Sequence, residues 1–197
     1  YGIPNLCMAG GVALNCVANG KIMRVKSFNE IWIQPAAGDS GGALGAALYV
    51  WYKELNKPRT ISSTDDMKGS FLGPSYSQQE IENDLHSCGA KFNSFSENDM
   101  LDHTVKALIE GKAVGWFQGR MEFGPRALGA RSIIADPRNE TMQKTLNLKV
   151  KNRESFRPFA PSVIREDVSD WFDLNTDSPY MLFVDYVKSN KRHDMSE

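Results

Sequence analysis

The chain has 197 residues, with 23 basic and 24 acidic side chains and a formal net charge of -1. Its 41% share of hydrophobic residues is ordinary for a globular protein and excludes a disordered or collagen-like chain. The longest uncharged apolar run covers residues 41–52, too short for the roughly 20 residues that span a bilayer, so we expect no membrane segment. Three cysteines without a CxxC pair predict a reducing, cytoplasmic location.

The small net charge hides a basic block. Residues 120–165 carry 10 basic and 4 acidic side chains, whereas residues 1–119 carry 10 and 12 and residues 166–197 carry 3 and 8. This balance excludes a general polyanion binder and argues against a nucleic-acid partner. It leaves room for a small anionic ligand at the block.

The first quarter of the chain alternates strand and helix patterns. Hydrophobic runs and glycine turns predict, in chain order, a strand, a helix, a strand and a helix over residues 5–9, 12–25, 30–34 and 41–55. We expect Asp39 or Ser40 to cap the last of these helices and Gly20 to be the weak point of the first. This order of elements is typical of an α/β fold.

Residues 57–75 lack periodicity and are rich in Pro, Ser, Asp and Gly, which predicts a linker. It separates a domain over residues 1–56 from a second one over residues 76–197. In the second domain the pattern predicts helices over 78–87, 98–110 and 140–150, a helical turn or two over 166–172, and strands over 90–95, 113–117, 132–135, 159–164 and 180–187. The start at Tyr1 without a methionine and the polar end predict a piece of a longer protein.

Two glycine turns form the first candidate site. The common phosphate-loop, dinucleotide, zinc-protease and serine-hydrolase motifs are absent from the sequence. Instead, a strand–helix junction occurs twice with glycines that let a ligand approach the backbone and with free N–H groups that attract anions. The residues are Gly10, Gly11 and Asn15 at the first junction and Gly38, Asp39, Gly41 and Gly42 at the second. Successive junctions of this kind point to the same edge of a sheet, where α/β folds bind ligands.

The basic block holds the second candidate site. A solvated helix face explains cations such as Arg138 and Lys144, but it does not explain arginines set among glycine, proline and phenylalanine. We interpret that setting as a pocket for phosphate, carboxylate or carbamate, because guanidinium forks match oxyanions. Stacking of the interleaved aromatic residues on nucleic-acid bases is the lesser alternative. The pocket candidates are Arg126, Arg131, Lys151, Arg153 and Arg157.

At these residues the sequence resembles the O-carbamoyltransferases of the nodulation, cephamycin and aminoglycoside pathways. The strings GGVALN at 10–15 and QPAAGDSGGALGAAL at 34–48 are similar to the end of their Kae1-like domain, which has the actin/hexokinase/Hsp70 ATPase fold. FGPRALG at 123–129 and FRPFAP at 156–161 are similar to their YrdC-like domain. The resemblance thus implies the end of a Kae1-like domain followed by a YrdC-like α/β domain, incomplete at both ends.

The resemblance also implies a two-stage reaction. Carbamoyl phosphate and ATP would form carbamoyl adenylate with release of pyrophosphate, and the carbamoyl group would then pass to a hydroxyl of a small metabolite. Gly10, Gly11 and Asn15 fall on nucleotide-contacting positions. Asp39 falls on the aspartate ligand of a divalent metal, iron in the family, with magnesium accompanying the nucleotide as the other reading. The five cations of the basic block fall where carbamoyl phosphate and the adenylate should bind.

The chain departs from the family at its ends. The paired metal histidines and the last YrdC-like segment are missing, so we expect activity to require the remainder of the parent chain. Two alternatives stay open. One is an enzyme of tRNA threonylcarbamoylation, which would need a broad basic face, and the other is a non-catalytic module that binds a nucleotide or phosphate.

Overall fold

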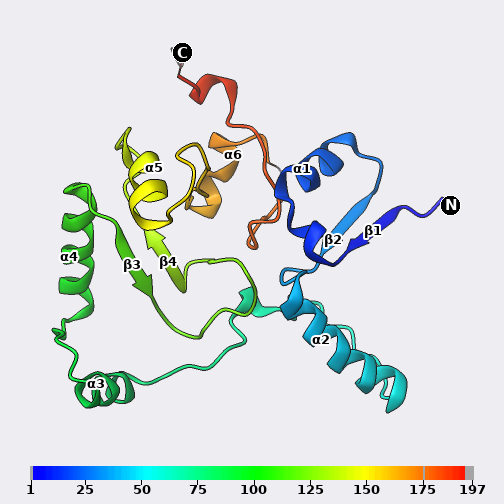
Figure 1. Ribbon diagram of the computed structural model, residues 1–197. Helices are drawn as coiled ribbons and strands as arrows, with labels where there is room; N and C mark the ends of the chain where they lie inside the picture. Colours follow the sequence, from blue (N-terminus) through cyan, green and yellow to red (C-terminus); the bar gives the residue numbers. More distant parts are fainter. Residues whose placement is uncertain (1, 175, 194–197) are drawn as a thin grey trace. The chain divides into compact units, whose positions relative to one another are not determined.

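The computed structural model describes residues 2–174 and 176–193 (Figure 1). The fold is mixed α/β, as the sequence predicts. The chain divides into two compact units that do not follow the sequence order. Unit 1 comprises the described parts of Tyr1–Leu72, Glu122–Leu128 and Ser162–Glu197, and unit 2 comprises Gly73–Met121 and Gly129–Pro161. The domain boundaries at residues 56 and 75, drawn from the pattern alone, stay a prediction.

Unit 1 begins with the predicted strand–helix–strand–helix order. Strand β1 (Asn5–Met8) pairs in parallel with β2 (Glu30–Ile33), with Asn5 opposite Glu30 and Met8 opposite Ile33. Between them lie the 3-10 turn η1 (Gly11–Leu14) and helix α1 (Cys16–Val25). Helix α2 (Asp39–Tyr49) follows β2 and continues as a π-helical turn, η2 (Val50–Glu54).

Two positions in these helices bear on the sequence prediction. The N-cap of α2 is Gly38 and not Asp39 or Ser40. Asp39 lies in the first turn instead, where its negative charge interacts favourably with the positive end of the helix dipole. Gly20 lies within α1, which runs unbroken from Cys16 to Val25, and its weakening effect on the helix stays a prediction. A Cβ there would lie 2.2 Å from the carbonyl oxygen of Val184, so the glycine lets the segment around Val184 pack directly on the helix.

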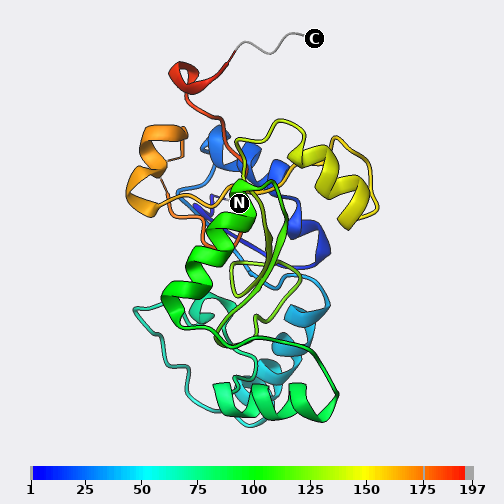
Figure 2. The ribbon, with the colours of Figure 1, turned by 90° about the vertical axis from the view of Figure 1, so that its left-hand side faces the viewer.

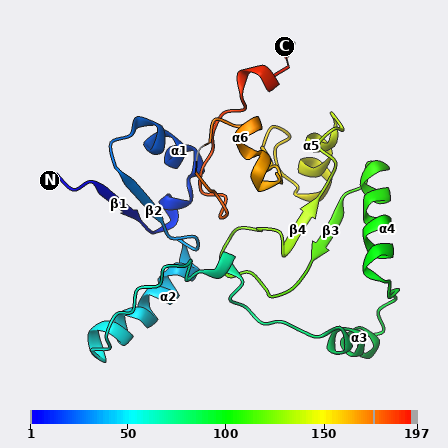
Figure 3. The same ribbon diagram turned by 180° about the vertical axis from the view of Figure 1, so that it is seen from behind.

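The rest of unit 1 comes from the second half of the chain. It contains the short turns η3 (Lys68–Ser70), η5 (Arg165–Asp167) and η6 (Ser189–Lys191) and the helix α6 (Val168–Trp171). The segment over residues 180–187 passes beside α1 (Figure 3). Leu182 from this segment joins Ala13, Ile33 and Ala37 in the buried core of the unit.

Unit 2 combines helices with an antiparallel hairpin. Helices α3 (Gln78–Ser87) and α4 (Glu97–Ile109) are capped by Ser77 and Ser96. Strand β3 (Val114–Phe117) pairs with β4 (Arg131–Ile134), with Val114 opposite Ile134, and α4 lies alongside this pair (Figure 2). Helix α5 (Met142–Thr145) continues into a π-helical turn, η4 (Leu146–Val150), which matches the helix predicted over residues 140–150.

Three predicted strands are wrong. Residues 90–95 follow Gly89, whose positive φ ends the turn after α3, and have no strand partner. Residues 159–164 contain Pro161, which cannot donate to a ladder, and remain irregular. Residues 180–187 contain Met181 with a φ of 52°, which a regular strand does not accommodate. Their only ladder contact within the described residues is a single bridge between Phe172 and Val187.

Two further properties bear on the sequence predictions. Within residues 2–174 and 176–193, no helix is long and apolar enough to cross a membrane. Cys7 and Cys88 are exposed, whereas the apolar character of cysteine favours burial in a protein core.

Candidate functional site

In unit 1, the two glycine turns lie at the same edge of the parallel pair, where β1 and β2 end. The amide of Gln34 donates to the carbonyl of Met8, 3.0 Å away, which extends the pairing to the turns. A Cβ on Gly38 would lie 3.8 Å from Leu14 at the end of the first turn. The structure therefore brings the two turns together, as the parallel arrangement predicts.

The first turn is built by Gly10 and closed by Asn15. Gly10 has a φ of 88°, which glycine adopts without strain, and its carbonyl accepts the amide of Ala13 at 3.0 Å. Gly10 and Gly11 have open space where a Cβ would be, so a ligand could approach their backbone. The Oδ1 of Asn15 accepts the amide of Ala18 at 3.1 Å and caps α1, which gives this residue a structural role.

The second turn is more tightly packed. A Cβ on Gly41 would lie 2.2 Å from the carbonyl oxygen of Ala36, so glycine at this position lets the start of α2 press against the preceding turn. Gly42 has open space at the same point. Of these two glycines, only Gly42 leaves room for a ligand.

Asp39 is exposed in the first turn of α2. Within residues 2–174 and 176–193, no group of three or more His, Cys, Asp or Glu side chains could hold a metal ion. One carboxylate is not a metal site, because divalent cations take several protein ligands. The described residues by themselves do not fit a metal centre.

A segment of the basic block, Glu122–Leu128, belongs to the same unit as the glycine turns. The amide of Phe123 donates to the carbonyl of Ser70 at 2.7 Å, and a Cβ on Gly124 would lie 3.1 Å from that of Ala36. The half-buried Arg126 donates from Nη2 to the carbonyl of Leu14 at 2.6 Å. The structure thus places a cation directly on the first glycine turn.

The other four cations lie in unit 2. Arg131 begins β4, opposite Phe117. Lys151, Arg153 and Arg157 lie on one loop, which follows η4 and which we call the 151–159 loop. Lys151 and Arg157 are exposed and Arg153 is half-buried.

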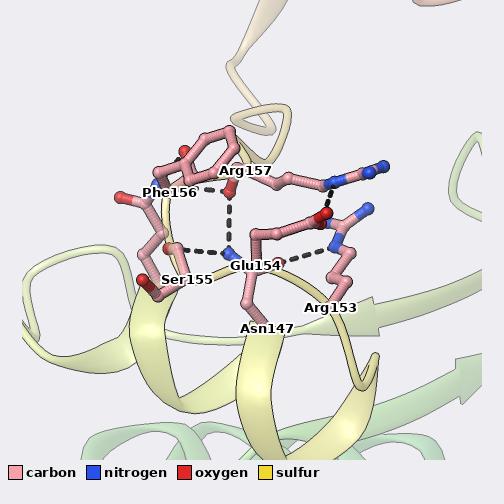
Figure 4. A network of polar contacts seen from close by, with 7 residues as sticks. Asn147, Arg153, Glu154, Ser155, Phe156 and Arg157 are labelled. Atoms are coloured by element: carbon pink, nitrogen blue, oxygen red, sulfur yellow. Dashed lines mark hydrogen bonds and ion pairs between the residues drawn. The ribbon is translucent and has the colours of Figure 1, made fainter.

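The 151–159 loop is held by polar contacts that the sequence prediction did not include (Figure 4). Asn147 and Gln143, one turn apart on α5 and η4, donate to carbonyl oxygens of this loop. Arg157 donates from Nε to Glu154 at 2.7 Å, and both side chains are about half exposed. A backbone hydrogen bond, and after it the bond from Arg157, lowers the pKa of Glu154. One signal in the sequence could have pointed to Asn147, an amide within the otherwise apolar stretch Leu146–Leu148.

Comparisons with known proteins connect both halves of the sequence to one family. The family model described as the carbamoyltransferase N-terminus matches residues 1–48, and the one described as the carbamoyltransferase C-terminus matches residues 105–197. The chain belongs to the carbamoyltransferase family. This confirms the resemblance that GGVALN, FGPRALG and FRPFAP carry.

Relatives of this carbamoyltransferase chain match it over nearly its whole length. The uncharacterized protein sll1178 of Synechocystis is 56% identical over 97% of the chain, and nodulation protein NolNO of Sinorhizobium fredii is 41% identical over 98%. The 3'-hydroxymethylcephem-O-carbamoyltransferase of Streptomyces clavuligerus is 33% identical over 93%. The chain spans 31%, 28% and 32% of these three relatives, about a third of their length.

Proposed function

We propose that the chain is part of an ATP-dependent O-carbamoyltransferase that acts on a hydroxyl of a small metabolite. The observation that carries the proposal is the match to both the N-terminal and the C-terminal model of the family. The relative from Streptomyces supports it, because that protein is named for O-carbamoyl transfer to a hydroxymethyl group. The Kae1-like and YrdC-like folds, and a cytoplasmic location, are part of the same proposal.

The first stage would form carbamoyl adenylate. Carbamoyl phosphate and ATP would give carbamoyl adenylate, pyrophosphate and, with one water consumed, inorganic phosphate, so that atoms balance. In the second stage the acceptor hydroxyl would attack the carbamoyl carbon, the bond to AMP would break, and the hydroxyl proton would leave with a base. We assign no residue of this chain as that base.

The residues of unit 1 support a nucleotide site at the turns. Open backbone at Gly10, Gly11 and Gly42 suits close approach of a phosphate. Arg126, bonded to the carbonyl of Leu14, is held at the same turn. A guanidinium there would stabilise negative charge as pyrophosphate departs.

The residues of unit 2 support an oxyanion site on the 151–159 loop. Lys151, Arg153 and Arg157 lie within seven positions of one another on this loop, and Arg131 stands on the hairpin of the same unit. Cations of this kind would bind carbamoyl phosphate and neutralise charge that develops at phosphorus.

Asp39 is the one residue of this chain that we propose as a metal ligand. This carboxylate would be one ligand of a divalent ion, iron or the magnesium that accompanies ATP, and the remaining ligands would have to come from outside the described residues. When bound, such an ion would polarise the oxygens around the reacting group. Every other role above belongs to side chains and backbone groups of this chain.

The test is pyrophosphate release by the complete protein encoded by the reading frame that contains this chain. Release should require ATP and carbamoyl phosphate together, and Arg126→Ala should lower it by about 100-fold or more, the scale for loss of one charge-stabilising donor. Arg59→Ala, which removes an exposed cation of the linker region, is the matched control and should leave the rate unchanged. Release with ATP alone, or none with both substrates, would contradict the proposal. Tight nucleotide binding without product would favour a non-catalytic module.

A further inference from the structure

Asn147 is a fully buried polar residue that none of the roles above uses. It lies in η4, between the buried Leu146 and the partly exposed Leu148, and its exposed fraction is 0%. A buried amide is costly unless its polar atoms find partners. The partners of Asn147 therefore indicate what the residue does.

The amide nitrogen of Asn147 holds the backbone of the 151–159 loop. Its Nδ2 donates to the carbonyl of Ser155 at 3.1 Å and to that of Arg157 at 2.8 Å. Gln143 adds bonds of 3.2 Å to the carbonyls of Phe156 and Arg157. The loop thus has two amide donors on one helical face, and Asn147 is the buried one.

The amide oxygen of Asn147 binds a side chain, that of Arg153, and not the loop backbone. Its Oδ1 accepts the Nε–H of Arg153 at 2.6 Å, and its main-chain carbonyl accepts the amide of Arg153 at 3.0 Å. The guanidinium carbon of Arg153 lies 4.9 Å from the centre of the Phe159 ring. A hydrogen bond at Nε and a ring under the guanidinium restrict both the position and the plane of this group.

These contacts leave the far edge of the guanidinium for a ligand. Within the part of the chain that the structure describes, neither Nη atom of Arg153 has a hydrogen bond or ion pair. Figure 4 shows the guanidinium groups of Arg153 and Arg157 on the same side of the network, away from the helix that carries Asn147. The carboxylate of Glu154 bonds to the Nε of Arg157 and also interacts with the charge of Arg153. Because Glu154 is exposed, water screens both interactions.

We infer that Asn147 is a positioning residue that orients Arg153 to bind the phosphate group of a small substrate through its two Nη atoms. The inference rests on the proposed function, and it names phosphate-bearing substrates as the ligand class. Carbamoyl phosphate and ATP share this chemistry. Orienting a long side chain before the ligand arrives lowers the conformational entropy that binding would otherwise lose.

The first experiment measures the Asn147–Arg153 bond without any ligand. In an NMR spectrum of the 197-residue chain, the Nε–H of Arg153 should exchange with solvent at least about tenfold more slowly than that of the exposed Arg59, because a buried acceptor protects it. Equal exchange rates would overturn the inference, and this measurement needs no variant that has to fold.

Three substitutions then separate positioning of Arg153 from support of the loop. Asn147→Ala removes the acceptor and both loop bonds, whereas Asn147→Asp keeps an acceptor and loses the same loop bonds. Gln143→Ala weakens the loop alone. Protection of the Arg153 Nε–H should be lost in Asn147→Ala and kept in the other two. A purely structural role predicts the same loss in both Asn147 variants and would overturn the inference.

The second experiment uses calorimetry on the complete protein encoded by the reading frame that contains this chain, and it measures binding of carbamoyl phosphate and, in a separate titration, of ATP. Asn147→Ala should weaken binding of at least one of them about tenfold, the scale of one hydrogen bond to a charged group. Gln143→Ala should change it less than about twofold. The substrate whose affinity falls is the one that Arg153 binds.

The outcomes distinguish this inference from the proposed function. Unchanged affinity in a folded Asn147→Ala chain overturns the inference while the proposed function stands. If the unaltered complete protein binds neither compound, the proposed substrate site and the ligand assignment fail together. The link between Asn147 and Arg153 is then decided by the exchange rates alone.

Discussion

Among the residues that the structure describes, each compact unit has one fully buried asparagine, and the two asparagines have different roles. Asn19 in unit 1 and Asn147 in unit 2 are 1% and 0% exposed. The Nδ2 of Asn19 donates to the carbonyls of Ala13 and Leu182, and that of Asn147 to Ser155 and Arg157. The first pair joins segments 163 residues apart, and the second joins residues at most 10 apart.

The oxygens of the two amides differ more sharply. The Oδ1 of Asn147 accepts from Arg153, whereas the Oδ1 of Asn19 is buried and has no hydrogen-bond partner among the described residues. An unsatisfied buried acceptor costs free energy, and at Asn19 the two bonds donated by Nδ2 must offset that cost. Asn19 therefore connects the 180–187 segment to α1 through its donors alone, whereas Asn147 holds the loop through its Nδ2 and orients Arg153 through its Oδ1. Burial of the same amide therefore connects distant segments in one unit and orients a neighbouring side chain in the other.

Replacing each asparagine with aspartate should separate the two roles most strongly. Asn19→Asp removes both donors and sets a carboxylate against two carbonyls, so it should lower the free energy of unfolding of unit 1 by about 3–5 kcal/mol at neutral pH. Asn147→Asp also loses two donors but gains a charge-assisted bond to Arg153, so its cost in unit 2 should be at least about 1.5 kcal/mol smaller.

Denaturant unfolding, followed by hydrogen exchange in each unit separately, measures this difference. Burial raises the pKa of the carboxyl introduced by Asn19→Asp, so the native state binds the extra proton more tightly and stability should fall as pH rises. Equal costs for the two substitutions at neutral pH would contradict the distinction.

Substitutions of two glycines in helices of unit 1 test whether the close packing of Val184 on α1 contributes to stability. Gly20→Ala should lower the free energy of unfolding by about 1–3 kcal/mol, because the Cβ would meet the carbonyl oxygen of Val184 at 2.2 Å. Gly45→Ala in α2 is the matched control. It meets open space and should raise stability by about 0.5–1 kcal/mol. If both changes stabilise the protein, the 180–187 segment does not pack on α1.

A second long-range contact in unit 1, the hydrogen bond from the Tyr180 hydroxyl to Asp65, should make the stability of the unit depend on pH. Burial, and then the hydrogen bond to Asp65, raises the pKa of Tyr180 to about 12. The pKa of Asp65 is lowered, because bonds from Tyr180, Gly69 and Met67 outweigh the effect of burial. The Tyr180 contribution is therefore present below about pH 10 and lost as pH rises towards 12, and that of Asp65 is lost as pH falls below its ordinary value of 3.8.

Tyr180→Phe should lower the free energy of unfolding by about 1 kcal/mol at neutral pH. The difference from the unaltered chain should shrink at both ends of the pH range. Unfolding curves at acid, neutral and alkaline pH measure it. A difference that stays constant across pH would show that the hydroxyl bond does not contribute.

The smallest effect is expected at a local ion pair of unit 2. Arg138 donates to both carboxylate oxygens of Asp136, which lowers the pKa of Asp136 to about 2. Arg138→Gln should return this pKa towards its ordinary value of 3.8 with little change in stability, because exposed pairs contribute little. An NMR titration of the Asp136 carboxyl measures it, and Arg165→Gln, which leaves Asp136 untouched, is the control. An unchanged pKa would contradict the assignment.

The sequence predicts well the features whose causes are local. Helix α3 was predicted with its observed bounds, and β2 and α4 within one residue of theirs at each end, because caps and periodicity lie within the elements themselves. The pair of glycine turns at one sheet edge was also predicted, because parallel strands bring successive turns together. The family followed from short strings such as FGPRALG.

The sequence could not predict features that depend on distant partners. Residues 180–187 have a strand-like composition, but Asn19 and Arg24 hold their backbone by side-chain bonds from α1, so no ladder is needed. The placement of Arg126 on the carbonyl of Leu14 joins residues 112 apart. Among the predicted site residues, spacing alone groups only those that are close in sequence, namely the residues within each glycine turn and those of the 151–159 loop.

The composition of unit 1 has a consequence for synthesis on the ribosome. Its core needs Leu182 as well as Ala13 and Ile33, so the unit cannot be completed until Leu182 has emerged. Unit 2 ends at Pro161, and its hairpin and helices depend mainly on neighbours in the chain. The unit that begins first should therefore finish folding last: a nascent chain whose residues up to Pro161 have left the ribosome, with residues 180–187 still inside it, would carry a finished unit 2 and an open β1–β2 pair.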